Sequence, residues 1–428
     1  MTDLSKNNWL LNTIIYQLFV GRWQNANLID HHHQVFKRLA STDYSKLKAL
    51  GIDTLYLLGL FNNCGPIVVS EEGGKDLSDQ ELRIPSPFAL TDHTQPNPLL
   101  GSESDLVELI KTLHSHQFKV IIDFIPNHTS LFHPWTKSHP EYYHHQDGQK
   151  VAEFSKDVYK LNYENPQLRE AMLSVLTTIQ SWGVDGVRVD MAHLIPSDFW
   201  HQAIPKLKII NSQFIFIAEA YPESLFDLTP LHQLLQAGFD AIYHEPLYRN
   251  LSQAIHHHQP LSFVTEHLNY INQQSFSSTL VNYIANHDDS LLSSQHTEAL
   301  LSLIIFLPGI PFLYNGLLNN LPNRLAHHYF ESLPNNFNEL NTIPPAVSKV
   351  LEYRKQNSPT LIKIELLDTK LISLTVKVIS GSTATIFINL TPSDQALPTL
   401  ESAGLIHQLS SGQILPMGQT EIFSTDPT

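Results

Sequence analysis

The sequence predicts an α/β fold, a closed (β/α)8 TIM barrel of eight parallel strands, each followed by a helix. Eight short runs are nearly continuous in apolar, β-branched and aromatic residues, which is typical of strands buried on both faces. Amphipathic segments separate them. A doubly wound open sheet has the same local pattern, but the alternation of eight strands with helices favours the barrel. The runs begin at Ile14, Thr54, Val120, Gly186, Phe214, Ala241, Leu280 and Ile310.

Two of the intervening helices carry clear start signals. After Asn165 and Pro166, apolar residues recur every three or four positions as far as Ile179, and Gly183 follows. Asparagine is a good N-cap, proline suits the first helical position, and glycine is common just after a helix. Ser102 stands in the same way before a second apolar pattern. We therefore expect helices to begin directly after Asn165 and Ser102.

Two long connections and a change of pattern near the C-terminus set the domain organisation. Residues 61–101 and 128–165 both leave C-terminal strand ends, where a barrel builds its active site. From residue 361, apolar and polar residues alternate between turn residues, which predicts a small antiparallel β domain. We expect the barrel in residues 1–127 and 166–360, a short inserted domain in 128–165, and the β domain in 361–428.

The composition excludes several classes of protein. Of 428 residues, 42% are apolar and 16% are charged, so general disorder is excluded. The net charge of −15 argues against nucleic acid or an anionic membrane as the partner. The single cysteine, Cys64, excludes an internal disulfide and a cysteine-rich metal site. No apolar run reaches about 18 residues and the N-terminus has no signal-peptide pattern, so we expect a cytoplasmic location.

Polar clusters follow the predicted strands at their C-terminal ends. Acidic residues inside apolar strands are costly unless they are paired or functional. A surface position or a helix cap could explain any one of them, but not the whole ordered series. In a barrel these ends meet over one mouth. The clusters are Asp123, Asn127 and His128 on the third strand, Arg188 and Asp190 on the fourth, Glu219 on the fifth, and Asn286 to Asp289 on the seventh.

This set of residue types suits the cleavage of glycosidic bonds. Retaining hydrolysis needs one ionised carboxylate as nucleophile and one protonated carboxyl group as proton donor. Arg188 is expected to keep Asp190 ionised, as a nucleophile must be. The apolar run before Glu219 is expected to raise the pKa of that carboxyl group, which suits the acid. Neutral histidine and asparagine side chains can hold sugar hydroxyl groups.

Four segments of the chain resemble the signature regions of the α-amylase family, glycoside hydrolase family 13. They are DFIPNH from Asp123, GVRVD from Gly186, IAEA around Glu219, and ANHD from Ala285, in the order of the family. The resemblance spans about residues 14–361. It implies that Asp190 is the nucleophile, Glu219 the general acid/base, and Asp288 the third carboxylate. It also implies retaining chemistry at α-glucosidic bonds.

The resemblance also implies a set of residues around the sugar. Its substrate-binding positions correspond to Phe88, Asp92, His128, Arg188, His193 and His287. Asn127 matches a position that ligates calcium in many relatives. The calcium carboxylates of the inserted domain are not evident, so we expect that no cofactor is required and that calcium is absent or weakly bound.

Some positions depart from the family pattern. Phe88 stands where a tyrosine is usual, and Lys160 stands where an aspartate is common. Leu317 and Leu318 follow Gly316, where polar residues are usual. These departures leave the central carboxylates intact and affect positions around them.

Three functions follow from these observations. We favour a hydrolase of α-glucans or maltooligosaccharides. A transglycosylase or phosphorylase on the same scaffold, such as a glucanotransferase, uses the same residues and differs in the acceptor. A catalytically inactive glucan-binding protein is the third.

Several conspicuous residues are expected to be structural. We expect the histidine runs 31–33 and 256–258 to be solvated and Cys64 to be a structural thiol. The aromatic residues Trp135, Tyr142 and Tyr143 are expected to form the core of the inserted domain, although they could also stack on sugars.

Overall fold

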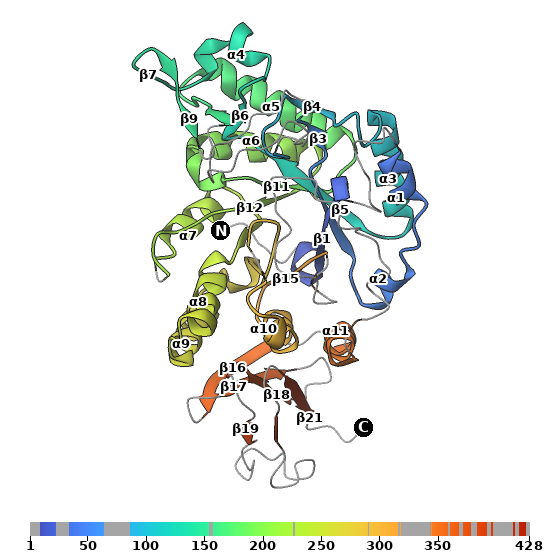
Figure 1. Ribbon diagram of the computed structural model, residues 1–428, viewed down its shortest axis with the longest axis vertical. Helices are drawn as coiled ribbons and strands as arrows, with labels where there is room; N and C mark the ends of the chain where they lie inside the picture. Colours follow the sequence, from blue (N-terminus) through green and yellow to red (C-terminus); the bar gives the residue numbers. More distant parts are fainter. Residues whose placement is uncertain are drawn as a thin grey trace, which may run out of the picture.

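The structure is a computed structural model of the 428-residue chain, and most of the barrel is described (Figure 1). The described residues are 9–22, 34–63, 86–153, 157–225, 227–289, 291–315, 317, 343, 345–357, 360–367, 371–377, 383–391, 395–396, 414–415 and 419–424.

Eight parallel strands close into a barrel, which confirms the predicted fold class. Each of the eight apolar runs forms one barrel strand, and the strands follow one another around the barrel in chain order until β15 pairs with β1. The strands are β1 (Ile15–Phe19), β2 (Thr54–Leu58), β5 (Lys119–Phe124), β11 (Gly186–Val189), β12 (Ile215–Ala218), β13 (Ala241–Tyr243), β14 (Leu280–Asn282) and β15 (Ile310–Tyr314).

The register of the central strands decides which side chains meet. Arg188 on β11 lies opposite Asp123 on β5 and opposite Ile217 on β12. Below this level, aromatic side chains fill the barrel: Tyr243 and Phe312 have ring centroids 5.6 Å apart. Because the interior is packed, the strands hold their C-terminal side chains in fixed positions.

Helices surround the barrel, and both predicted helix starts are confirmed. The Asn165 side chain accepts the N–H groups of Gln167 and Leu168, and Ser102 forms a capping box with Asp105. The helices are α1 (Val35–Ala40), α2 (Ser45–Ala49), α3 (Glu103–Ser115), α5 (Pro166–Ser181), α6 (Ser197–Ile210), α7 (Thr229–Gln236), α8 (Glu245–His256), α9 (Leu261–Asn272), α10 (Thr297–Phe306) and α11 (Pro345–Asn357).

The two long connections form small structures beside the barrel mouth, at the top of Figure 1. β3 (Phe61–Asn62) pairs with β4 (Asp92–Pro96). Residues 128–160 form a sheet of β6 (His128–Ser130), β10 (Val158–Lys160) and β9 (Ala152–Glu153), a hairpin of β7 (His145–Gln146) and β8 (Gln149–Lys150), and the helical turn α4 (Trp135–Ser138). The boundaries of the inserted domain at residues 128 and 165 stay a prediction.

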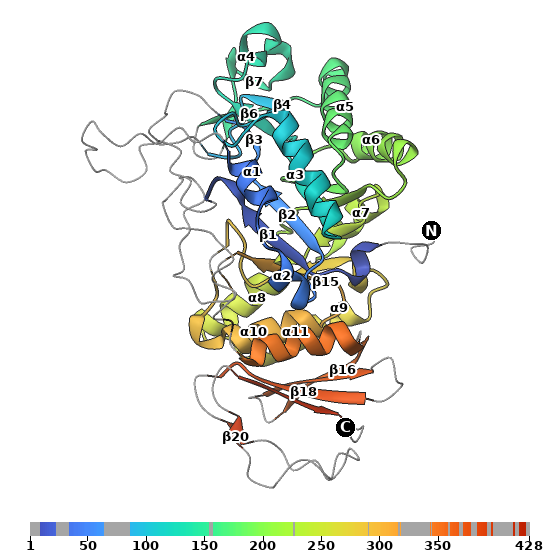
Figure 2. The same ribbon diagram turned by 90° about the vertical axis from the view of Figure 1, so that its right-hand side faces the viewer.

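An antiparallel sheet follows the barrel at the opposite end (Figure 2). Its strands are β16 (Thr360–Leu367), β17 (Leu371–Lys377), β18 (Thr383–Asn389) and β21 (Thr420–Ser424), and a separate pair joins β19 (Gln395–Ala396) to β20 (Ile414–Leu415). Helices α10 and α11 lie between this sheet and the barrel strands. Residues 397–413 of the predicted β domain lie outside the described residues. In the described part of the chain, every helix is too short or too polar to span a bilayer.

Candidate active site

One buried arginine gathers three carboxyl groups at the mouth of the barrel. The side chain of Arg188 is 1% exposed, and its Nη1 lies 2.9 Å from Oδ1 of Asp190 and 3.2 Å from Oδ1 of Asp123. Its Nη2 pairs with Oε1 of Glu219. These groups come from β5, β11 and the end of β12, so the barrel brings together residues that are far apart in sequence. A buried charge of this kind is stable only when it is paired.

Asp190 follows β11 directly, and its N–H donates to the carbonyl of Phe124. Burial raises the pKa of Asp190 to about 6, although Arg188 pulls it down. Arg188 lowers this pKa, as expected, but desolvation of the carboxylate outweighs the nearby guanidinium, so the pKa of Asp190 lies above its ordinary value. At neutral pH the group is still mostly ionised, since its pKa lies below 7.

Glu219 is held from three sides. Its Oε1 accepts the hydroxyl group of Tyr221 at 2.8 Å and pairs with Arg188. Its Oε2 accepts the N–H of Met191 at 2.9 Å. Burial raises the pKa of Glu219 while Arg188 opposes the rise, which confirms the predicted direction. A carboxyl group that keeps its proton longer is suited to act as an acid.

A residue with an unusual backbone conformation supports this geometry. Met191 has φ +46, in the left-handed region that few residues other than glycine adopt. The chain turns there immediately after Asp190, and the turn points the Met191 N–H at Glu219. Sequence reasoning missed Met191 and Tyr221. A tyrosine two positions after the predicted acid was the available signal for Tyr221.

Asp288 and His287 lie beyond β14 and reach the site through a turn. The Asn286 side chain accepts the N–H groups of Asp288 and Asp289, at 2.8 and 2.6 Å. Nε2 of His287 lies 3.0 Å from Oδ2 of Asp288, and its Nδ1 lies 2.9 Å from the Gln17 amide. Burial alone would lower the pKa of His287, but pairing with Asp288 outweighs it and the pKa is raised.

Phe88 packs against the charged groups at the mouth. Its ring stacks on His287 with centroids 5.1 Å apart and planes 18° apart, and the Arg188 guanidinium lies 5.7 Å from its centroid. His128, the first residue of β6, is buried, and burial lowers its pKa to about 4. This imidazole is therefore neutral near pH 7, as expected for a group that exchanges hydrogen bonds with sugar hydroxyls.

The remaining two predicted substrate residues are Asp92 and His193, and the His193 ring lies beside the backbone of Glu219. The Oδ1 atom of Asp92, in β4, accepts the N–H and hydroxyl groups of Thr94 and so stabilises its own turn. His193 lies in a short 3-10 turn after Met191, with its ring edge-on to Tyr221 at 6.0 Å. Asp289, expected to be a neighbour of the catalytic groups, accepts the Tyr283 hydroxyl group.

The residues at the calcium position do not fit that ion. The Asn127 amide donates a hydrogen bond to Oε2 of Glu153 at 2.6 Å. The Lys160 ammonium lies 2.8 Å from Oε1 of the same carboxylate. Calcium requires oxygen atoms pointing at it, whereas here N–H groups point at the carboxylate. Among the described residues, no three His, Cys, Asp or Glu side chains are grouped to hold a metal.

The remaining conspicuous residues have structural surroundings where they are described. Tyr142 and Tyr143 are buried, and Trp135 packs edge-on against Tyr142 with centroids 5.4 Å apart. Residues 256–258 are exposed, as expected for solvated histidines, and Leu317 is buried. The histidine run 31–33, Cys64 and Leu318 lie outside the described residues.

Comparison with known proteins finds similarity to α-amylases and to a cyclomaltodextrin glucanotransferase. Residues 41–152 match the family model described as "Alpha amylase, catalytic domain". The chain is 24% identical over 349 residues to Alpha-amylase 3 of Dictyoglomus thermophilum, covering 72% of this chain and 64% of that protein. It is 20% identical over 394 residues to a cyclomaltodextrin glucanotransferase of Thermoanaerobacterium thermosulfurigenes, covering 80% and 54%.

Similarity to solved structures extends over nearly the whole chain. The crystal structure of an α-amylase from Lactobacillus plantarum superposes with a TM-score of 0.75 at 22% identity, covering 98% of this chain and all of the other. At this level of identity the likeness concerns the fold. The chain spans less than two thirds of the length of the two curated relatives.

Proposed function

We propose that the chain is a divergent member of the α-amylase family and a retaining glycosidase acting on α-glucans or maltooligosaccharides. The observation that carries this proposal is the pair of buried carboxyl groups, Asp190 and Glu219, held by the single guanidinium of Arg188. Retaining cleavage uses two such groups, one as nucleophile and one as acid.

In the first step, the Asp190 carboxylate attacks the anomeric carbon of the sugar. Glu219 gives its proton to the glycosidic oxygen, so the leaving sugar departs as an alcohol and a glycosyl ester of Asp190 forms. In the second step, the Glu219 carboxylate takes a proton from water. The water oxygen then displaces Asp190 from the anomeric carbon, which restores both groups and retains the configuration.

The surrounding residues support the charge changes of these steps. Arg188 stays protonated and offsets the negative charge that moves between Asp190 and Glu219. Asp288 is 34% exposed, so its carboxylate is open to the sugar, and pairing with His287 orients it. We assign His128, His287, Asp288 and Phe88 to the sugar at the cleaved bond, and Asp92 and His193 to its neighbours.

Maltoheptaose tests this function directly. Hydrolysis gives only shorter products, and NMR at early times finds the α-anomer at the new reducing end. The control is the variant Asp190→Asn, purified in the same way. Because it lacks the proposed nucleophile, any turnover that it shows comes from contaminating enzymes. A product of β configuration contradicts the retaining mechanism. Equal and zero turnover of both proteins on a broad panel of α-glucosides contradicts the enzyme and leaves a glucan-binding protein.

Transfer is the second candidate, supported by the similarity to a cyclomaltodextrin glucanotransferase over 80% of the chain. In this reaction a sugar hydroxyl group replaces water in the second step. Products longer than maltoheptaose in the same incubation identify transfer. Products confined to shorter chains exclude it.

We further propose that no calcium is required, because the Lys160 ammonium supplies the positive charge beside Glu153. The melting temperature of the wild type is expected to stay unchanged with calcium or with a chelator. Lys160→Asp adds oxygen ligands, and its melting temperature should rise with calcium. Lys137→Asp, at an exposed position of α4, is the matched control. A fall in the melting temperature of the wild type on chelation contradicts the proposal.

A cytoplasmic location belongs to the same proposal. It is supported by the single cysteine, since no internal disulfide holds the chain together. Fractionation of the source cells, with activity assayed in each fraction, tests this location.

A further inference from the structure

A cavity of about 790 Å³ lies at the end of the barrel opposite the carboxylates. Its walls come from the segments that precede β1, β2, β5, β14 and β15, together with α11 and the first residues of β16. These segments are the N-terminal ends of the barrel strands, whereas Asp190 and Glu219 follow C-terminal ends. The cavity is therefore separate from the candidate active site, and its size is that of a small-molecule site.

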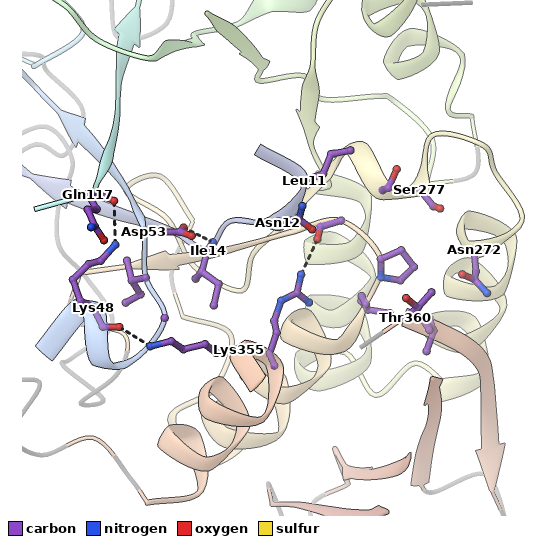
Figure 3. Close-up of a pocket in the computed structure, with 18 residues that line it drawn as sticks. Leu11, Asn12, Ile14, Lys48, Asp53, Gln117, Asn272, Ser277, Lys355 and Thr360 are labelled. Atoms are coloured by element: carbon purple, nitrogen blue, oxygen red, sulfur yellow. Dashed lines mark hydrogen bonds between the residues drawn. The ribbon is translucent and has the colours of Figure 1, made fainter. Parts of the chain in front are cut away.

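The two sides of this cavity differ in chemical character (Figure 3). Lys48 and Lys355 lie on one side, near Asp53 and Gln117. The other side carries neutral hydroxyl and amide groups, those of Asn272, Ser277 and Thr360.

The charged groups of the cavity are mostly positive. Lys48, Arg354 and Lys355 line it, and Asp53 is the carboxylate among its lining residues. Asp53 already accepts the N–H of Ile14 at 3.3 Å and the Thr13 hydroxyl group. Three cations against one carboxylate give the cavity a positive potential, although the net charge of the chain is −15.

Arg354 is half-buried, and in the part of the chain that is described its guanidinium donates to neutral acceptors. Its guanidinium donates to the carbonyl oxygens of Ile305 and, at 3.4 Å, Gly309. Burial lowers the pKa of Arg354 to about 10. A guanidinium removed from water without a counter-ion is costly, and an anion in the cavity would reduce that cost.

The two lysines are neighbours, and each ammonium group donates to a backbone carbonyl oxygen. The Lys355 ammonium donates to the backbone carbonyl of Lys48 at 3.2 Å, and the Lys48 ammonium donates to that of Gln117 at 3.0 Å. Burial lowers the pKa of Lys48, Asp53 opposes this, and the charge of Lys355 adds to it. Both ammonium groups retain donors for a further acceptor, since each has three N–H bonds.

We propose that this cavity binds a small phosphorylated sugar. Its phosphate group lies beside Lys48 and Lys355, and its hydroxyl groups face Asn272, Ser277 and Thr360. Phosphate suits cationic side chains, and hydroxyl groups suit a neutral polar wall. The inference goes beyond the proposed function, whose substrate is uncharged and binds at the other end of the barrel.

Thermal melting and titration calorimetry with glucose 6-phosphate test this site. The wild type should show a saturable rise in melting temperature, and glucose at the same concentration should not reproduce it. Lys48→Ala combined with Lys355→Ala should weaken binding by about tenfold or more, because two charged contacts are lost. Lys46→Ala, on the same helix but outside the cavity lining, is the matched control. Both variants should keep the turnover of maltoheptaose.

Three outcomes overturn the proposal. The first is no heat and no change in melting temperature for the wild type at about 10 mM ligand, well above an ordinary metabolite affinity. The second is equal binding by the wild type and the double variant, which places the ligand elsewhere. The third is equal affinity for inorganic phosphate and glucose 6-phosphate, which removes the role of the sugar. Arg354 is not substituted, because it holds the backbone carbonyl groups of Ile305 and Gly309 and its loss could unfold the protein.

Discussion

The two ends of the barrel differ in how an arginine side chain is accommodated. At the mouth, Arg188 is surrounded by Asp123, Asp190 and Glu219, so cation and carboxylates satisfy one another. At the base, Arg354 contacts backbone carbonyl groups and shares a cavity with two lysines.

This difference in the partners of the two arginines indicates what each end of the barrel can do. At the mouth the guanidinium and the carboxyl groups are paired with one another, and in the proposed mechanism Glu219 gives its proton to the substrate. Among the described residues that line the cavity at the N-terminal ends of the strands, three cations accompany one carboxylate, and the proposed anionic ligand would offset this excess. Changes at the mouth should therefore alter chemistry, and changes at the base should alter stability or ligand response.

The largest effect is expected at Asp190, the proposed nucleophile. Asp190→Asn should lower kcat by about 10⁴-fold or more, because no covalent intermediate forms. Calorimetry with maltoheptaose should still detect binding. The control is Asp185→Asn, which changes an aspartate just before the other end of β11, where it pairs with Lys119. Its kcat should stay close to that of the wild type. A large loss in the control would show that the two ends are not separable.

The acid should show a smaller loss that depends on the leaving group. Glu219→Gln is expected to lower kcat on maltoheptaose by about 10²- to 10⁴-fold. On a 4-nitrophenyl maltooligosaccharide the loss in the first step should be much smaller, since that leaving group needs no proton. Stopped-flow release of 4-nitrophenol measures it. Equal losses on both substrates would contradict the role of Glu219 as acid.

At the base, a backbone substitution should change stability and leave chemistry intact. Gly309 has φ +108, and a Cβ there would lie 2.2 Å from the carbonyl oxygen of Leu280. Gly309→Ala should lower the free energy of unfolding by about 2–4 kcal/mol. Gly148→Ala is the control, because Gly148 also has positive φ but open space around it. Its cost should be about 1 kcal/mol. Denaturant unfolding measures both, and a lower kcat in folded Gly309→Ala would contradict the separation.

The pH dependence of kcat/KM should reflect the titration of Asp190 and Glu219 at the mouth and not the lysines at the other end of the barrel. Asp190 must be ionised to attack, and its pKa is raised to about 6. The value of kcat/KM should therefore fall about tenfold per pH unit below pH 6. At higher pH it should fall again as Glu219, whose pKa is also raised, loses its proton. The variant Lys48→Ala should reproduce the acid limb of the wild type. A shift of the acid limb in Lys48→Ala would mean that the N-terminal end of the barrel influences the titration at the mouth.

The sequence predicted all eight barrel strands because each is a nearly continuous apolar run. It also predicted the helix starts at Asn165 and Ser102, where a cap and an amphipathic pattern agree. The meeting of Arg188, Asp190 and Glu219 followed from one rule, that C-terminal strand ends converge. Sequence proximity showed that Arg188 neighbours Asp190, but not the depth of burial that raises the pKa of Asp190 to about 6.

What the sequence determined by itself is therefore the barrel, the order of its strands and the identity of the carboxylates at its mouth. These depend on local patterns and on their spacing along the chain. Only the tertiary structure decided the left-handed turn at Met191, the hydrogen bond from Tyr221 to Glu219 and the contact between Lys160 and Glu153. It also decided the cavity at the base, whose lysines come from helices about 300 residues apart. Contacts of this kind depend on packing between distant segments, and no local pattern encodes them.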